Sequence, residues 1–179
     1  MFDWVKCFPI AVLVAFVAWS GPSQAETAST TPTQAESSEE VLLTVVLVAE
    51  DGLTQEYTLS QLRALGAETF ETETIWTTGL QRFTGVPLVD LIAPFNIEQG
   101  VLQARAVNDY MIEIPLSDAV EGGPIIAYER NGKTMPLRSK GPLWIVYPYD
   151  SNPAYKTEAI YSRSIWQLES LSLAAAAKQ

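Results

Sequence analysis

The chain has 179 residues, with 21 acidic and 11 basic side chains, a net charge of −10, no histidine and a single cysteine, Cys7. A chain this acidic repels nucleic-acid phosphates and anionic lipids, so we expect neither as a partner. Beyond Cys7 it offers no thiol and no imidazole, which excludes the usual zinc, iron and copper ligand sets and the Ser-His and Cys-His nucleophile pairs.

The first residues predict a secretion signal. Residues 7–19 form an almost wholly apolar run after Lys6, and residues 23–25 place small side chains at the two positions that a signal peptidase reads. The run is too short to cross ~30 Å of hydrocarbon comfortably, so we predict a signal peptide over 1–25. An uncleaved membrane anchor is the alternative, whereas a lipoprotein is disfavoured because Cys7 precedes the run. Cleavage leaves a periplasmic or secreted chain with no membrane span and no disulfide.

Residues 26–40 are rich in Thr, Ser, Glu and Gln, have no apolar periodicity and predict a disordered linker before a domain over 41–173. Runs of β-branched or alternating residues predict the first strands, of which 41–48 is expected to be buried on both faces. A short helix over 61–65 is expected after Ser60 as its N-cap, ending at Gly66. The strands predicted in this half are 41–48, 54–58 and 70–76.

In the second half, Pro87 suits the first position of a helix carrying Leu88, Leu91 and Ile92. The dipeptide at 131–132, Asn-Gly, predicts a tight hairpin because both residues tolerate positive φ. The further elements are strands 101–107, 110–114, 124–129, 143–147 and 164–173, a short helix at 115–120 and a frayed tail at 174–179. Short strands with few short helices predict a mixed-sheet α+β domain.

Four segments in order resemble one known family. They are 83–92, with Gly85-Val86-Pro87-Leu88; 104–110, followed by Ile114-Pro115; 126–133, Ile-Ala-Tyr-Glu-Arg-Asn-Gly-Lys; and 141–148, which begins Gly-Pro-Leu. Together they resemble the oxidoreductase molybdopterin-binding domain family, whose fold is that of sulfite oxidase. The resemblance implies the same α+β fold over most of 41–173, and a pocket for the molybdenum cofactor.

The chain departs from this family where the metal would bind. Family enzymes hold molybdenum through a cysteine in the strand before the Gly-x-Pro-Leu helix, and the matching strand here offers Thr72 and Thr74 instead. An alcohol is a poor substitute for a soft thiolate. Trp144 stands where the family has an arginine, and the histidine often found in its cofactor pocket has no counterpart. Members that carry the cofactor resemble twin-arginine cargo, yet residues 1–25 contain no arginine, so we expect export of the unfolded chain by the general route.

Several polar and aromatic residues are candidates for binding a ligand. Tyr147, Tyr149 and Tyr155 cluster with Asp150 and Lys156 in a Pro-rich loop, which predicts either the rim of a pocket or a rigid packed loop. Arg138 and Lys140 are candidates for an anion, or a solvated basic turn. By the family resemblance, Asn108, Asp109, Tyr110 and Trp144 belong near the pocket, although Asn-Asp is also ordinary turn chemistry. We expect Trp76, Trp144 and Trp166 in the core.

These observations favour a domain that has lost molybdenum and acts as a non-catalytic module without a cofactor. Its partner would be a small anionic ligand or a membrane sensor protein. The alternative is a molybdopterin-binding oxidoreductase without a cysteine ligand. A purely structural role, acting through a sheet edge or an apolar patch, is a third hypothesis.

Overall fold

The computed structural model describes residues 39–48 and 52–175. The predicted signal peptide, nearly all of the predicted linker and residues 176–179 lie outside these described residues. No helix among the described residues is both long enough and apolar enough to span a membrane.

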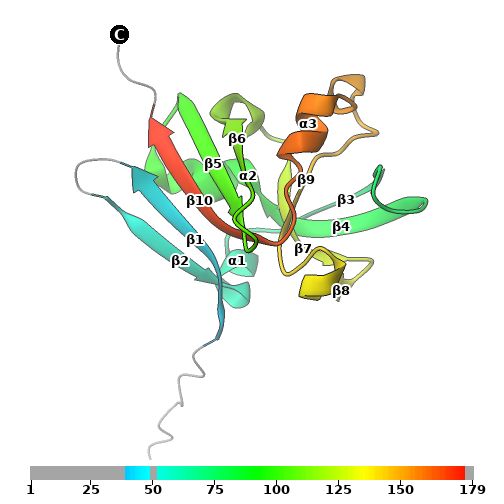
Figure 1. The fold of residues 1–179 in the computed structure, drawn as a ribbon, viewed down its shortest axis with the longest axis horizontal. Coiled ribbons are helices and arrows are strands. Elements are labelled where there is room, and N and C mark those ends of the chain that lie inside the picture. The colour runs from blue at the N-terminus through cyan, green and yellow to red at the C-terminus, as the bar shows by residue number, and fades with distance from the viewer. Residues whose placement is uncertain (1–38, 49–51, 176–179) are drawn as a thin grey trace, which may run out of the picture. The chain divides into compact units, whose positions relative to one another are not determined.

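Five strands form the first sheet, sheet A, in the order β2-β1-β10-β5-β6 (Figure 1). The central strand β10 pairs in parallel with β1 and antiparallel with β5, and the outer pairs β1–β2 and β5–β6 are antiparallel. The sheet is therefore mixed, as the sequence predicts. Its strands are β1 Val41–Val48, β2 Thr54–Thr58, β5 Gly100–Ala106, β6 Met111–Pro115 and β10 Leu168–Ala175.

Five more strands form sheet B, in which all pairs are antiparallel. The order β3-β4-β7-β8 is completed by β9, which also pairs with β7. The hairpin between β7 and β8 turns through Asn131 and Gly132, whose φ angles of 54° and 72° confirm the predicted tight turn. The strands of this sheet are β3 Glu68–Glu73, β4 Leu80–Pro87, β7 Ile125–Arg130, β8 Lys133–Thr134 and β9 Trp144–Val146.

The helices are short and connect the strands. Thr58 caps α1 through a capping box with Gln61, so this helix begins before the predicted Ser60 cap. The α-helices are α1 Leu59–Ala64, α2 Leu88–Ile92 and α3 Glu158–Arg163, and the 3-10 turns are η1 Ala93–Phe95, η2 Leu116–Asp118, η3 Leu137–Ser139 and η4 Pro153–Tyr155. Strands with a few short helices confirm the α+β class.

One hydrophobic core is shared by the two sheets. In β1 only Leu43 and Val45 are fully buried, while Val41 and Val48 are exposed, so the prediction that this strand is buried on both faces is wrong. Alternation with period two explains the result, because only one face of sheet A packs on the core. The core also takes in Trp144, Tyr147 and Tyr149, each at most 1% exposed.

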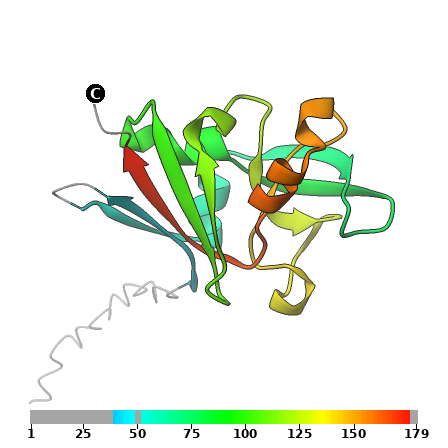
Figure 2. The ribbon, with the colours of Figure 1, turned by 45° about the horizontal axis from the view of Figure 1, so that its top comes forward.

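The connection from α3 to β10 joins the two sheets. The backbone N–H of Ile145 in β9 donates to the carbonyl of Ile165 (2.9 Å), and the N–H of Val107, just after β5, donates to the carbonyl of Gln167 (3.0 Å). Trp144 and Trp166 form an isolated antiparallel bridge. Figure 2 shows this connection descending from α3 before β10 enters sheet A. Residues 164–167 therefore link β9 of sheet B to the end of β5 in sheet A through the backbone.

Two sequence predictions need correction at this end of the chain, and one helix was missed. The predicted strand 164–173 begins only at Leu168, because Gln167 has a φ of 54° and the residues before it make the bridge and turn just described. The same strand runs on to Ala175, two residues into the predicted frayed tail, because Ala174 and Ala175 pair with β5. Helix α3, capped by Thr157, was not predicted.

Candidate functional site

Thr72, in the strand where the family resemblance places a metal ligand, is fully buried, and its hydroxyl is hydrogen-bonded to Asp150. Its Oγ1 donates to Oδ2 of Asp150 (3.1 Å) and accepts from the backbone N–H of Asp150 (3.2 Å). The same carboxylate oxygen accepts from the N–H of Glu73 (2.7 Å), and Lys156 lies 2.7 Å from the other oxygen. The hydroxyl therefore has its donor and one acceptor position occupied by protein.

The electrostatics of this contact fix the charge on Asp150. The salt bridge from Lys156 and then the Glu73 N–H hold the pKa of the Asp150 carboxyl below its ordinary value, and Asp150 in turn raises the pKa of Lys156. Asp150 and Lys156, both candidates from the sequence, thus clamp the loop after β9 onto the end of β3. They act on structure here, and neither lines the pocket described below.

Thr74 closes the turn that follows β3. The predicted strand over 70–76 ends at Glu73, because the Thr74 hydroxyl accepts from the backbone N–H of Trp76 (3.1 Å) and pairs with the Thr77 hydroxyl (2.8 Å). Such hydroxyl-to-backbone bonds compete with strand pairing and favour turns. The turn places Trp76 against the aromatic cluster behind it and exposes Ile75.

Trp144 fills the space beneath this turn. Its indole is fully buried, donates from Nε1 to the carbonyl of Ser164 (3.1 Å), and packs edge-on against Phe83, Trp76 and Trp166 at centroid distances of 5.3, 5.8 and 6.3 Å. The prediction that it belongs to the core is confirmed. Trp76 and Trp166 pack on the same cluster but are only partly buried, so each has a side free for other contacts.

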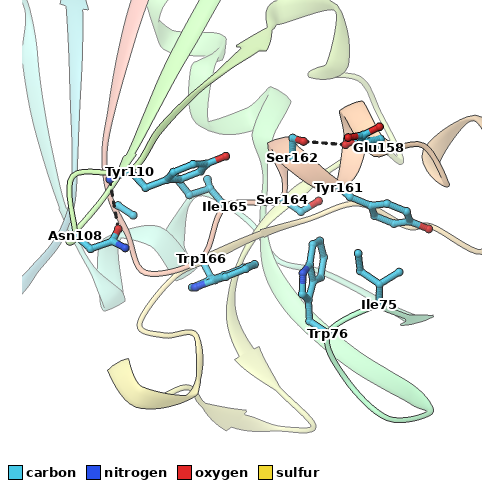
Figure 3. Close-up of a pocket in the computed structure, with 11 residues that line it drawn as sticks. Ile75, Trp76, Asn108, Tyr110, Glu158, Tyr161, Ser162, Ser164, Ile165 and Trp166 are labelled. Atoms are coloured by element: carbon cyan, nitrogen blue, oxygen red, sulfur yellow. Dashed lines mark hydrogen bonds between the residues drawn. The ribbon is translucent and has the colours of Figure 1, made fainter.

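A pocket of about 600 Å³ opens beside these indoles, where the ends of both sheets meet (Figure 3). This volume lies within the range for small-molecule sites. Three segments build it: the turn after β3, the β5–β6 turn, and α3 with the connection to β10. Its lining residues are Ile75, Trp76, Ala106, Asn108, Tyr110, Glu158, Tyr161, Ser162, Ser164, Ile165 and Trp166.

The walls of the pocket are mainly aromatic and aliphatic, with few polar groups. Of its two serines, Ser164 is buried and already bonded, accepting from the Tyr149 hydroxyl (2.6 Å) and donating to the carbonyl of Ile160 (2.8 Å). Glu158 and Asn108 are exposed at the edge. Among the described residues that line it, Glu158 carries the only charge, and none is a lysine or arginine.

Two of the candidates predicted from the sequence line this pocket, Asn108 and Tyr110. Asp109 lies between them in the chain at a φ of 65° and forms an ion pair with Arg105 at the surface. Asp109 therefore fits the alternative interpretation, in which Asn108 and Asp109 form an ordinary turn. Arg138 is exposed and lies outside the lining, as does Lys140.

Lys140 instead stacks on tryptophan. Its Nζ lies 3.7 Å from the ring centroid of Trp166 and 5.4 Å from that of Trp144. Partial burial, together with repulsion from Arg130, lowers the pKa of the Lys140 ammonium. The lysine covers these indoles as a cation–π partner and does not point into the pocket lining.

The three tyrosines of the Pro-rich loop differ in burial: Tyr147 and Tyr149 are buried, whereas Tyr155 is only partly buried. The Tyr147 hydroxyl donates to Oδ2 of Asp118 (2.7 Å), which also pairs with Arg163 (2.9 Å), and Tyr149 bonds Ser164 as above. Burial strongly raises the pKa of both phenols. Of the two interpretations of this loop, the packed one fits Tyr147 and Tyr149. Tyr155 is partly buried against the Tyr147 ring.

Sequence reasoning missed most of the lining, including Ile75, Tyr161, Ser162 and Ile165. The sequence does contain a signal for α3, because Thr157 followed by the acidic Glu158 is typical of the start of a helix. No local pattern could show that α3 lies across from the β5–β6 turn, because that contact depends on long-range pairing of β5 with β10.

Residues 54–151 match the protein family described as oxidoreductase molybdopterin binding domain, and the chain therefore belongs to this family. The match covers β2 through β9 and ends just before α3 and the connection to β10. No curated protein matches the chain.

The described residues do not fit the molybdenum cofactor of the family. They include no cysteine, and no three or more Cys, Asp and Glu side chains among them are grouped to hold a metal ion. The Thr72 hydroxyl already donates to Asp150, and the buried Trp144 indole stands at the position where the family resemblance places an arginine. The neighbouring pocket is lined by one carboxylate and by no lysine or arginine, and such a lining does not suit the phosphate of a pterin cofactor.

Proposed function

We propose that this member of the family is a non-catalytic, exported domain that binds a small ligand in the pocket between the β3–β4 turn, the β5–β6 turn and α3. The observation that carries the proposal is the hydrogen bonding of Thr72. Its fully buried hydroxyl donates to the carboxylate of Asp150 and accepts from the Asp150 N–H, so the side chain is already used to hold the loop after β9. The pocket nearby retains the size and the apolar walls of a small-molecule site.

Export is supported by the sequence of residues 1–25. A single lysine, an apolar run and small residues before position 26 favour secretion by the general route, after which the domain folds outside the cytoplasm. A chain that crosses the membrane unfolded cannot carry a buried cofactor with it. We further propose that the domain presents its ligand to a membrane-bound sensor protein.

The family match favours a second candidate, an oxidoreductase that holds molybdopterin without a cysteine. Metal and pterin analysis of protein purified from its native compartment separates the two. We expect molybdenum and pterin at trace levels in the wild type and also in Thr72→Cys, because the lost thiolate is only one of several missing features. Stoichiometric molybdenum or pterin fluorescence in the wild type would overturn the proposal in favour of the oxidoreductase.

A further inference from the structure

The residues that line the pocket narrow the chemical class of the ligand that it can bind. Resting on the proposed ligand-binding function, we propose that it takes a small organic cation, an amine or a quaternary ammonium joined to an apolar body. Aromatic rings, one carboxylate and the shape of the lining carry this inference (Figure 3).

The aromatic walls stand at steep angles to one another. The ring of Trp76 makes an interplanar angle of 68° with Trp166 at 5.5 Å between centroids, and of 86° with Tyr161 at 5.8 Å. Figure 3 shows Tyr110 entering from the β5–β6 turn, opposite Trp76. Trp76 is thus packed at a steep angle on both Trp166 and Tyr161, and the ring surface that these contacts leave at the pocket can attract an ammonium group.

The one charged side chain in the lining of the pocket is acidic. Glu158, in the first turn of α3, is the one charged residue among the lining, and the whole chain carries a net charge of −10. An anionic ligand would meet this carboxylate without a basic partner in the lining, whereas a cation gains from it. The anionic ligand predicted from Arg138 and Lys140 would therefore have to bind outside this pocket.

A tethered cation already rests on the same aromatic system. The ammonium of Lys140 lies 3.7 Å from the ring centroid of Trp166, although Lys140 is not part of the lining. One face of the Trp166 indole is therefore accessible to a cation in this fold, and Lys140 occupies it. The same lysine opposes a second cation nearby, so Lys140→Gln is expected to strengthen binding of an amine.

Three probes of nearly equal shape and different charge test the proposal: phenethylamine, 2-phenylethanol and 3-phenylpropionate. Titrated into the mature domain and followed by tryptophan fluorescence, the amine is expected to bind about three- to tenfold more tightly than the alcohol, and the carboxylate weakest. The phenyl compounds do not absorb where tryptophan is selectively excited, so they do not lower the emission by absorbing the exciting light. A fall in emission therefore reports binding near the indoles.

Two variants assign the effect to the pocket. Glu158→Gln is expected to remove the preference for the amine over the alcohol and to leave binding of the alcohol unchanged. Glu98→Gln, which removes the same charge from an exposed position outside the lining, keeps the preference. Tyr110→Leu, at a half-exposed position that folding tolerates, is expected to weaken all three probes and the amine most.

The inference is overturned if none of the probes binds, if 3-phenylpropionate binds tightest, or if Glu158→Gln leaves the order unchanged. These outcomes would leave the absence of molybdenum untouched, because that is decided by metal and pterin content. Conversely, stoichiometric molybdenum would overturn the proposed function whatever the probes do.

Discussion

Thr72 ties two segments together that lie far apart in the chain. Through one hydroxyl it holds the end of β3 to the loop after β9, by a bond to the carboxylate of Asp150 and a bond from its N–H. A thiol at this position is a weak donor and a weak acceptor, so it could not hold the loop in the same way. Thr72 is therefore part of the scaffold that holds β3 to this loop.

Removing that hydroxyl should cost stability. Thr72→Val is expected to lower the free energy of unfolding by about 1–3 kcal/mol, because it leaves the N–H of Asp150 without its partner and removes one hydrogen bond from the carboxylate. Thr72→Ser keeps the hydroxyl and should lose only about 1 kcal/mol for the buried methyl group. Urea denaturation of the two variants and the wild type measures both. A valine variant as stable as the wild type would show that this bond contributes nothing.

The lowered pKa of Asp150 predicts how the stability of the domain depends on pH. Because Lys156 and the Glu73 N–H hold its pKa below the ordinary value of 3.8, the charged carboxylate stabilises the folded state above that pH, and this contribution is lost as the pH falls through the folded-state pKa. We expect the urea midpoint of the wild type to fall more steeply between about pH 5 and pH 3 than that of Asp150→Asn.

The matched control for this experiment is Glu98→Gln, which removes an exposed carboxylate outside the clamp. It should keep the steep acid dependence of the wild type. Equal slopes for the wild type and Asp150→Asn would mean that the salt bridge and the hydrogen bonds of Asp150 do not contribute to folding.

At the scale of elements, the glycine of the Gly-x-Pro-Leu motif is explained by close packing of β4 on β7. A Cβ at Gly85 would lie 2.2 Å from the carbonyl oxygen of Ile126 and 2.6 Å from Cα of Ala127, at the point where the register of the two strands shifts. Only a residue without a side chain allows this irregular pairing.

Gly85→Ala is accordingly expected to destabilise the domain by more than about 3 kcal/mol, since backbone atoms must move to admit the methyl group. Gly79→Ala is the comparison, because nothing lies within 4 Å of its added Cβ and only its φ of 67° is unfavourable, a cost of about 1 kcal/mol. Thermal melting of both variants gives the contrast. Similar melting temperatures would show that the strands separate without cost.

The same irregularity shows why some elements could be predicted and others could not. The β-branched and Leu-rich run of β1, the alternation of β5 and the Asn131-Gly132 hairpin follow directly from local pattern, although the burial of β1 does not. Strand β4 was not predicted, because the register shift at Gly85 breaks its alternation and Pro87 reads as the start of a helix.

The residues of the site can likewise be separated into those that the sequence could predict and those that it could not. Thr72 could be singled out from the sequence because the family motif fixes its strand, and Asn108 and Tyr110 because they belong to a motif in a turn. Tyr147 and Tyr149 could not be assigned, since only the tertiary structure decides whether a tyrosine after a strand points into the core or to a rim. The aromatic pocket as a whole required three segments that meet only through pairing of distant strands.

For the whole molecule, the connection between α3 and β10 links the pocket to the stability of the domain. Residues 164–167 line the pocket in part and donate to or accept from both sheets. A ligand that binds these residues in the folded state alone raises the apparent stability of the entire domain, by mass action.

The central claim is that the folded domain works without molybdenum and without a pterin. Native mass spectrometry of the protein purified from its own compartment tests it most directly. The account predicts a mass equal to that of a chain starting at Glu26, alone or with a small organic cation bound. A mass increased stoichiometrically by a molybdenum-pterin cofactor would contradict it.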